Sequence, residues 1–372
     1  MIRILQYIGT LNIGGSQSFL MELYRNIDKS KFQFDFIVFD TDINEEMYNE
    51  IINLGGKIYT IPKYNLLNHL LFKKWWNDFF RKHPEYKIIH GHVRSTAAIY
   101  MKIAKKYGVK TIIHSHSTSN GTGIKAIGRK ILQRNITKYA DYFFYCSQIS
   151  GEWLFGKEIV NSNKSFFIPN GIDMDKFNFS IKIRNEIRKK LNIRDNELLI
   201  GHVGRFTEPK NHKFIIEIFS EALKKDNRLK LILVGDGELK DKIEKYIDEN
   251  KIKDKVILTG AVKNTYDYYN AMDLFFFPSL WEGLPVSVVE AQSNGLECLL
   301  SDSITEDVTL TNLITKCNLN SPKDKWVNKI LSLINNKKRN GLSEIEKQKL
   351  EMFNSKNVSK RTEKMYLKIL EE

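Results

Sequence analysis

Apolar and polar residues alternate along this chain on two length scales. Short apolar runs are separated by longer segments in which apolar residues recur with helical spacing. The runs lie at residues 2–8, 32–39, 87–93, 110–116 and 142–147 in the first half, and at 198–204, 230–236, 255–260 and 274–279 in the second. Strands that alternate with helices in this way are typical of parallel sheets covered by helices. The pattern predicts an α/β fold, most simply the doubly wound arrangement.

The same pattern divides the chain in two. Its 372 residues are enough for two domains with separate cores. The alternation is interrupted at FFIPNGIDMDKFNFS (166–180), where Pro169, Asn170 and Gly171 form a turn cluster. We therefore expect one domain at residues 1–175 and a second at 176–356. Segment 357–372 reads as a helix that, from its pattern alone, could pack on either domain.

Composition narrows the class of protein. The three cysteines, Cys146, Cys298 and Cys317, are far apart and lack the spacing of a metal site or a disulfide framework, which fits a reducing cytoplasm. The N-terminal MIRILQYIGT reads as a first strand and not as a signal peptide. No apolar run reaches membrane-spanning length.

The positive charge is concentrated in one part of the chain. Residues 57–138 contain 17 Lys or Arg and two acids, a local excess of +15, whereas the rest of the chain sums to −1. Such a field favours an anionic partner. Within it, residues 64–83 predict an amphipathic helix, which either covers the first sheet or rests Trp75 and Trp76 on an anionic bilayer. Residues 123–138 predict a second basic helix nearby.

Two rival classes lack their expected motifs. A nucleic-acid-binding protein could use the basic segment, but no signature of base stacking or groove entry accompanies it. A nicotinamide dehydrogenase needs G-x-G-x-x-G after its first strand, and GTLNIGGSQ (9–17) lacks that spacing.

The most informative segment is PSLWEGLPVSVVEAQSNG (278–295), which places Glu282 in a loop and Glu290 on the helix that follows. Backbone N–H groups of Gly283 and Leu284 near the expected helix N-terminus suit oxygen-rich or anionic ligands. A carboxylate only accepts hydrogen bonds, so it can take two from a vicinal diol, as in a sugar or a ribose. Because Glu290 lies in an apolar stretch, it needs a donor, although spacing alone is equally compatible with two solvated acids.

Two further patterns carry charge. The loop in GHVGRFTEPKNHKF (201–214) holds Arg205 and Lys210, two cations that can neutralise a diphosphate without a metal. The Asp-x-Asp strings at 40–42 and 173–175 could instead suggest a metal-dependent transferase. We interpret both as turn or cap residues.

Taken together, GTLNIGGSQ (9–17), HSHS (114–117), IPNGID (168–173), GRFTEPK (204–210), LVGDGEL (233–239) and the 278–295 segment resemble retaining glycosyltransferases of family four. The order and spacing match over nearly the whole chain, and the closest resemblance is to transferases of capsular and exopolysaccharide biosynthesis. The resemblance implies the GT-B fold: two facing Rossmann-like doubly wound domains with an interdomain cleft, and the C-terminal helix returning to the first domain.

The resemblance also implies roles for particular residues. Glu290 would hold the ribose of a nucleotide sugar, Arg205 and Lys210 its diphosphate, and Glu282 with the Gly283 and Leu284 amides its hexose. Gly14 and Gly15 would allow close approach to the donor or the acceptor. His116 matches the family histidine near the reacting centre, although His114 shares its face of the strand.

The implied activity is hexosyl transfer with retention, without metal or other cofactor. The expected donor is a UDP-hexose, and the expected acceptor is a saccharide or a polyprenyl-diphosphate-linked saccharide. The implied location is the cytoplasm, with peripheral attachment to the inner face of the plasma membrane. A glucan synthase-type enzyme is the alternative within the same class.

Overall fold

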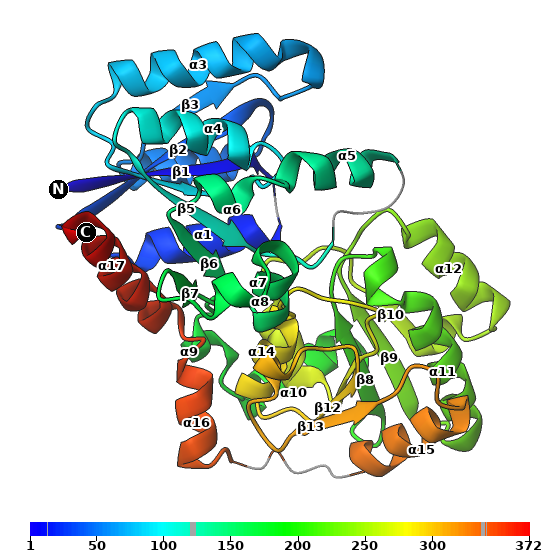
Figure 1. The fold of residues 1–372 in the computed structure, drawn as a ribbon. Coiled ribbons are helices and arrows are strands. Elements are labelled where there is room, and N and C mark those ends of the chain that lie inside the picture. Colours follow the sequence, from blue (N-terminus) through cyan, green and yellow to red (C-terminus); the bar gives the residue numbers. More distant parts are fainter. Residues whose placement is uncertain (13, 120–123, 336–338, 340) are drawn as a thin grey trace. The chain divides into compact units, whose positions relative to one another are not determined.

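The computed structural model describes residues 1–12, 14–119, 124–335, 339 and 341–372, without the side chains of 40–42 and 124–127. These residues form two compact units, the first comprising 1–171 with 353–372 and the second 172–352. Each unit is built on one parallel sheet with helices on its faces, as the alternating pattern predicts (Figure 1).

The first unit contains a seven-stranded sheet in the order β3-β2-β1-β4-β5-β6-β7. Its strands are β1 (Ile2–Leu11), β2 (Phe32–Ile43), β3 (Ile58–Ile61), β4 (Ile88–Gly91), β5 (Lys110–Ser115), β6 (Tyr142–Tyr145) and β7 (Ser165–Phe167). Its helices are α1 (Gly15–Asn26), α2 (Glu45–Asn53), the 3-10 turn η1 (Leu66–Asn68), α3 (His69–Lys82), α4 (Ala97–Lys106), α5 (Ile124–Gln133), α6 (Ile136–Tyr139), α7 (Gln148–Phe155), α8 (Lys157–Val160) and α17 (Ser355–Glu371).

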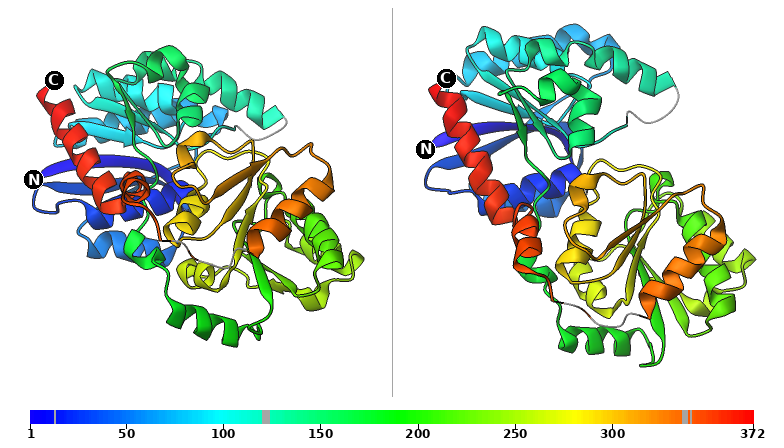
Figure 2. Two further views of the ribbon diagram at one scale, coloured as in Figure 1. Left: turned by 90° about the horizontal axis from the view of Figure 1, so that it is seen from below. Right: turned by 60° about the horizontal axis from the view of Figure 1, so that its bottom comes forward.

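Two apolar clusters cover the faces of this sheet because successive strand side chains point to opposite sides. On one face, Leu5 and Tyr7 pack with residues of α3 and α4. On the other, Ile4 and Ile8 pack with residues of α1 and α17. The last helix therefore completes the core of the first unit, and both views in Figure 2 show it running alongside this sheet.

Helix α3 corrects one sequence interpretation. Trp76 is fully buried and Trp75 partly buried, so these rings do not rest on a bilayer. Trp76 shares a helix face with Phe72 and Phe80 and stacks on Tyr100 at 5.3 Å between ring centroids. The alternative prediction is correct for the aromatic face of α3, which covers the sheet.

The second unit contains a six-stranded sheet in the order β10-β9-β8-β11-β12-β13. Its strands are β8 (Leu198–Val203), β9 (Leu229–Val234), β10 (Val256–Leu258), β11 (Leu274–Phe277), β12 (Cys298–Ser301) and β13 (Ile314–Cys317). Its helices are α9 (Met174–Phe177), α10 (Ile181–Lys190), α11 (His212–Lys225), α12 (Lys240–Glu249), α13 (Thr265–Ala271), α14 (Val286–Ser293), α15 (Lys323–Ile334) and α16 (Glu344–Glu351), with 3-10 turns η2 (Glu208–Lys210), η3 (Lys253–Lys255) and η4 (Glu306–Val308).

Both sheets reverse their strand order next to the first strand. In the first unit β1 lies between β2 and β4, and in the second β8 lies between β9 and β11. Doubly wound sheets bind ligands beyond the carboxyl ends of the strands at such a reversal, because the loops on either side diverge there. The topology thus directs attention to the loops after β1 and β4, and after β8 and β11.

Candidate functional site

In the second unit, a lysine and a glutamate meet at the strand-order reversal. Lys210 lies in η2 after β8, and Glu282 lies in the loop after β11. The Lys210 Nζ donates to Glu282 Oε1 at 2.8 Å, and both side chains are largely buried, at 17% and 13% exposure. The ammonium group also lies 4.8 Å from the centre of the Phe277 ring. Two residues 72 positions apart in sequence thus form one charged pair at the expected edge.

Gly204 provides the room for this lysine. A Cβ at residue 204 would lie 3.1 Å from Lys210 Cε and 3.2 Å from His202 Nε2, closer than most side chains tolerate. The loop is held from behind by Gly235 and Gly237. A Cβ at Gly235 would lie 2.0 Å from the Gly204 carbonyl oxygen, and one at Gly237 would lie 2.7 Å from that of Phe206. The GDG sequence is therefore explained by the close packing of two loops.

Arg205 stands apart from this pair. Its side chain is exposed, on the same loop as Lys210. A flexible exposed guanidinium can reach an anion as it binds, whereas the buried Lys210 is already oriented by Glu282.

Glu290 lies on α14 and accepts a hydrogen bond from the hydroxyl of Tyr269 at 2.7 Å. Burial raises the pKa of Glu290 to about 7, while the Tyr269 donor and the nearby Lys210 oppose that rise. Glu290 lies in apolar surroundings and therefore needs a hydrogen-bond donor, and Tyr269 near the end of α13 is that donor. No motif in the sequence identified Tyr269. Gly283 and Leu284 form the turn before α14, with Leu284 buried and Pro285 at the N-cap.

In the first unit, Gly14 and Gly15 follow β1 at the start of α1. A Cβ at Gly15 would meet no atom within 4 Å, and one at Gly14 would meet only the flexible end of Gln17. Within the described part of the chain, packing therefore does not require glycine at position 15.

Four histidines gather at the carboxyl ends of β4 and β5. His114 and His116 stack at 4.0 Å between ring centroids, as expected for residues on the same face of a strand. His114 is fully buried and both its ring nitrogens are hydrogen-bonded. His116 differs, because its buried Nδ1 has no partner among the residues the structure describes. The geometry thus separates two histidines that sequence alone left equivalent.

His90 and His92 are also part of this cluster. His90 Nε2 contacts His114 Nδ1 at 3.3 Å, and His92 Nδ1 contacts His116 Nε2 at 2.8 Å. The nitrogens of His90, His92 and His114 lie close enough together to ligate a cation. However, each of these nitrogens already has a hydrogen-bond partner in the present arrangement.

The Asp-x-Asp string at 173–175 lies at the start of α9. Asp173 is the N-cap residue of α9 and pairs with Lys176 at 3.0 Å. The side chains of Asp40 and Asp42 lie outside the described residues.

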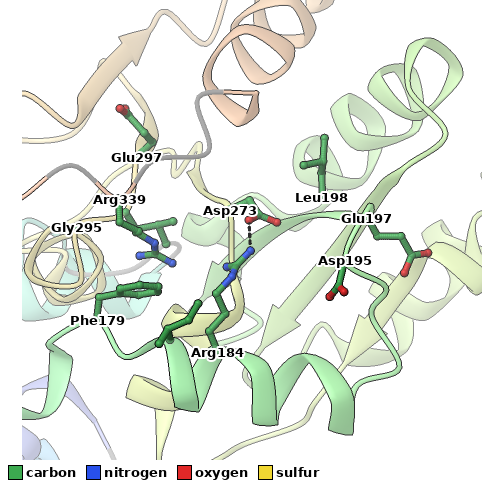
Figure 3. A pocket seen from close by; sticks show the side chains of 11 residues that line it. Phe179, Arg184, Asp195, Glu197, Leu198, Asp273, Gly295, Glu297 and Arg339 are labelled. Atoms are coloured by element: carbon green, nitrogen blue, oxygen red, sulfur yellow. Dashed lines mark hydrogen bonds and ion pairs between the residues drawn. The ribbon is translucent and has the colours of Figure 1, made fainter.

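Each unit also contains a hollow away from these residues. In the second unit, a hollow of about 220 Å³ lies at the amino ends of β8, β11 and β12, the edge opposite Lys210 (Figure 3). Arg184 pairs there with Asp273 at 2.5 Å. In the first unit, a basic hollow of about 840 Å³ is lined by residues of α5, α6 and α7 and of the turns after α5 and α7. Its charged residues are Lys130, Arg134 and Glu152, and Trp153 also lines it.

The fold and this site define a two-unit α/β protein whose second unit offers a cation and carboxylates to an anionic, hydroxyl-bearing ligand. Residues 13–176 match the family described as Glycosyltransferase Family 4, and residues 183–349 match Glycosyl transferases group 1. A Bacillus subtilis protein named "Putative glycosyltransferase EpsF" is 33% identical over 334 residues, covering 88% of this chain and 86% of its own. The chain therefore belongs to glycosyltransferase family four, with the GT-B fold.

Other relatives agree with this placement. An Escherichia coli enzyme named UDP-Gal:alpha-D-GlcNAc-diphosphoundecaprenol alpha-1,3-galactosyltransferase is 28% identical over 300 residues, covering 76% of this chain and 75% of its own. A Staphylococcus aureus relative is named for capsular polysaccharide biosynthesis. The Anabaena protein Alr3699/HepE, solved in complex with UDP, matches with a TM-score of 0.81 at 15% identity, covering 99% of this chain and 100% of its own. The protein is thus a transferase of the capsule and exopolysaccharide type.

Proposed function

We propose that the protein transfers a hexose from UDP-hexose to a lipid-linked saccharide with retention of anomeric configuration, during synthesis of a capsular or extracellular polysaccharide. The observation that carries the proposal is the buried Lys210–Glu282 pair beside Glu290 at the strand-order reversal of the second sheet. The choice of UDP is supported by the HepE complexes with UDP and UDP-glucose. Neither a metal nor another cofactor takes part in this scheme.

In this scheme each group has a distinct task. Lys210 and Arg205 stabilise the negative charge that grows on the departing diphosphate. Glu290 accepts hydrogen bonds from the ribose hydroxyls, and Glu282, with Gly283 and Leu284, orients the hexose. The acceptor attacks from the face that the diphosphate leaves, so its proton can pass to the leaving phosphate. Because charge on the phosphate is larger in the transition state than in the bound donor, Lys210 contributes mainly to kcat.

The basic hollow of the first unit supports a lipid-linked acceptor. Lys130 and Arg134 are exposed at its rim, and Trp153 and Phe155 give it an apolar side. A polyprenyl diphosphate combines an anionic head with an apolar chain, and the E. coli relative is named for such an acceptor. Replacing Lys130 and Arg134 with alanine should raise KM for the acceptor and leave KM for the donor unchanged.

The test begins with binding. Calorimetric titration with UDP, GDP, ADP and NAD in metal-free buffer should show binding of UDP that weakens in Glu290→Ala. UDP-hexoses are then offered with undecaprenyl-diphosphate-linked GlcNAc, and NMR of the product determines the anomeric configuration. Inversion would refute the retaining mechanism. Nucleotide binding that is indifferent to Glu290 would refute the ribose assignment, and transfer to glucan alone would favour the glucan synthase-type alternative.

We also propose that the enzyme works in the cytoplasm, attached to the inner face of the plasma membrane by a leucine surface. This surface consists of Leu66, Leu67, Leu70 and Leu71, which are 72%, 98%, 78% and 71% exposed. The exposed Lys63, Lys73 and Lys74 flank it. Contiguous exposed leucines beside lysines suit insertion into an anionic bilayer. Among the described helices, none is long and apolar enough to cross a membrane.

Vesicle flotation tests this attachment. Each buried leucine contributes about 1.5–3 kcal/mol, so Leu67→Asp with Leu70→Asp should lower binding to phosphatidylglycerol vesicles by more than about tenfold. Ile345→Asp is the matched control, because Ile345 is 68% exposed in the second unit. Equal flotation of the two variants would refute the leucine surface as the anchor.

A further inference from the structure

The histidine cluster of the first unit is one continuous chain of hydrogen bonds. It runs through six side chains from three strand regions and the last helix and ends on a backbone carbonyl. The members are His114, His90, Tyr366, Gln6, His92 and His116, with the carbonyl of Ile168 at one end. In such a chain every hydrogen bond points the same way, from donor to acceptor, and two opposite directions are possible. A terminal group that can only accept determines which direction is present.

The Ile168 carbonyl can only accept, so His114 Nε2, 3.2 Å away, must donate. In a neutral ring Nδ1 then accepts, and His90 Nε2 must donate to it. His90 Nδ1 accepts in turn from the Tyr366 hydroxyl at 2.7 Å. That hydroxyl has given up its only proton, so the Gln6 amide group, 3.2 Å away, donates to it through Nε2.

The second half follows from the orientation of this glutamine. Since Gln6 Nε2 faces Tyr366, Gln6 Oε1 faces His92 Nε2 at 3.1 Å and must accept from it. His92 Nδ1 therefore accepts from His116 Nε2 at 2.8 Å. His116 is left with its proton on Nε2 and a bare lone pair on Nδ1, the nitrogen that has no partner within the described structure.

We propose that His92 and Gln6 are positioning residues that hold His116 in the Nε2–H tautomer, so that His116 Nδ1 accepts a hydrogen bond from a hydroxyl of the bound sugar. The identity of the sugar ligand rests on the proposed function, whereas the tautomer does not. The enzyme then uses His116 as a neutral acceptor and not as a proton donor.

The surroundings of His116 agree with a neutral ring. Burial holds the pKa of His90, His92 and His114 well below the ordinary value, with the neighbouring rings adding to the effect. Burial and the facing Arg94 guanidinium lower the pKa of His116 to about 3.

A second acceptor lies beside the bare nitrogen. Asn170 lies next to His116 and is 7% exposed, and its Oδ1 also has no partner among the described residues. In the Nδ1–H tautomer His116 would donate to Asn170 Oδ1, and this neighbour opposes the lowering of the His116 pKa. In the Nε2–H tautomer that the chain of hydrogen bonds imposes, both Nδ1 and Oδ1 accept, so together they can receive the hydroxyls of one sugar.

The tautomers can be measured directly, without substrate, in protein labelled with ¹⁵N-histidine. Long-range ¹H–¹⁵N NMR spectra distinguish the protonated ring nitrogen from the bare one. We expect His90, His92, His114 and His116 all to be neutral and protonated on Nε2. A wild-type His116 protonated on Nδ1 would overturn the proposal. So would a stoichiometric metal ion whose removal changes these resonances, because a ligated nitrogen cannot also hold its hydrogen-bond partner.

Two substitutions at His92 test the dependence on that residue. His92→Phe removes the acceptor for His116 Nε2–H, so His116 should become a mixture of both tautomers. His92→Asn places an amide oxygen near the position of His92 Nδ1 and should restore the single Nε2–H form. A folded His92→Phe protein in which His116 keeps a single tautomer would overturn the proposal. If His92→Phe does not fold, the wild-type and His92→Asn spectra still test the proposal, because a His116 ring protonated on Nδ1 in the wild type would overturn it.

Kinetics connect the tautomer to the proposed reaction. His92→Phe should lower kcat by about tenfold, the value of one good hydrogen bond, with UDP affinity unchanged, and His92→Asn should recover most of it. If the wild type transfers no sugar at all, the proposed function fails while the NMR result stands by itself. If transfer is normal in a His92→Phe protein with mixed tautomers, the positioning role is refuted.

Discussion

The hydrogen bond from Tyr269 to Glu290 should control the pH dependence of nucleotide binding. Tyr269→Phe removes one oxygen and retains the ring, which is fully buried and packs 5.6 Å from Phe275 between ring centroids. Burial raises the pKa of Tyr269 well above its ordinary value, so the native hydroxyl is a permanent donor. Its loss removes a group that stabilises the ionised form of Glu290, and the pKa of Glu290 must rise.

The size of the rise follows from the bond that is lost. A hydrogen bond to a charged group is worth about 1.5–3 kcal/mol, which corresponds to about one to two pKa units. With a pKa of about 7, roughly half of Glu290 is ionised at neutral pH. In the variant the ionised share should fall to between about 1% and 10%. If the ribose requires the carboxylate, UDP affinity at neutral pH should fall by about fivefold to fiftyfold.

Calorimetric titration with UDP from about pH 6 to pH 9.5 measures this effect across both ionisation ranges. Affinity should rise with pH in both proteins, with the curve of Tyr269→Phe displaced to higher pH and meeting the wild type at the alkaline end. Tyr268→Phe is the matched control, since Tyr268 is a buried neighbour on the same helix. A loss that is the same at every pH, or no loss at all, would refute the link between Glu290 ionisation and ribose binding.

Three further substitutions and a chelation experiment separate stability from function. Because the folded pKa of Glu290 is raised, its stabilising contribution is complete below about pH 4.5 and is lost as pH rises through 7. Thermal unfolding should therefore show Glu290→Gln to be more stable than wild type by about 3 kcal/mol at pH 8 and equal to it at pH 4. Gly204→Ala should displace Lys210 and lower kcat by about tenfold or more, measured by UDP release. Gly15→Ala should leave the melting temperature unchanged but weaken donor or acceptor binding in titrations, since the new methyl group would meet no described atom within 4 Å but would meet a bound ligand. Transfer should continue in excess EDTA, and a loss restored by Mg²⁺ would contradict the metal-free scheme.

The fold was accessible from sequence because its main strands are strongly apolar and separated by segments of helical period. All nine predicted runs contain strands. The strands that the pattern did not reveal are β3, β7, β12 and β13. They are as long as the predicted strands β4, β6, β10 and β11, but each of them contains Ser, Thr or Lys, which those four lack. Three of them, β3, β7 and β13, are edge strands. An edge strand has a neighbouring strand on one side only, so its side chains are less completely buried and need not all be apolar.

The site was accessible only in part. Motif positions located Lys210, Glu282 and Glu290, but the partner of Glu290 comes from α13, where Tyr269 sits among other tyrosines with no distinguishing pattern. Similarly, the partners that orient His116 lie in β1, in the loop after β4 and in α17, up to 360 positions apart. Hydrogen bonds between distant segments leave no periodic signal in one sequence, so only tertiary structure reveals them.

The distribution of charge separates the basic segment, residues 57–138, from the cations that would bind the diphosphate of the donor. The cations of the candidate donor site, Lys210 and Arg205, belong to the second unit, which carries almost no net excess of base. The +15 excess of residues 57–138 lies wholly in the first unit, next to the leucine surface and the basic hollow. A leaving diphosphate needs two or three well-placed donors, whereas a charged bilayer is attracted by many dispersed ones. We therefore propose that the basic field serves a membrane and a lipid-linked diphosphate and not the nucleotide sugar, so that each unit would recognise a different anion.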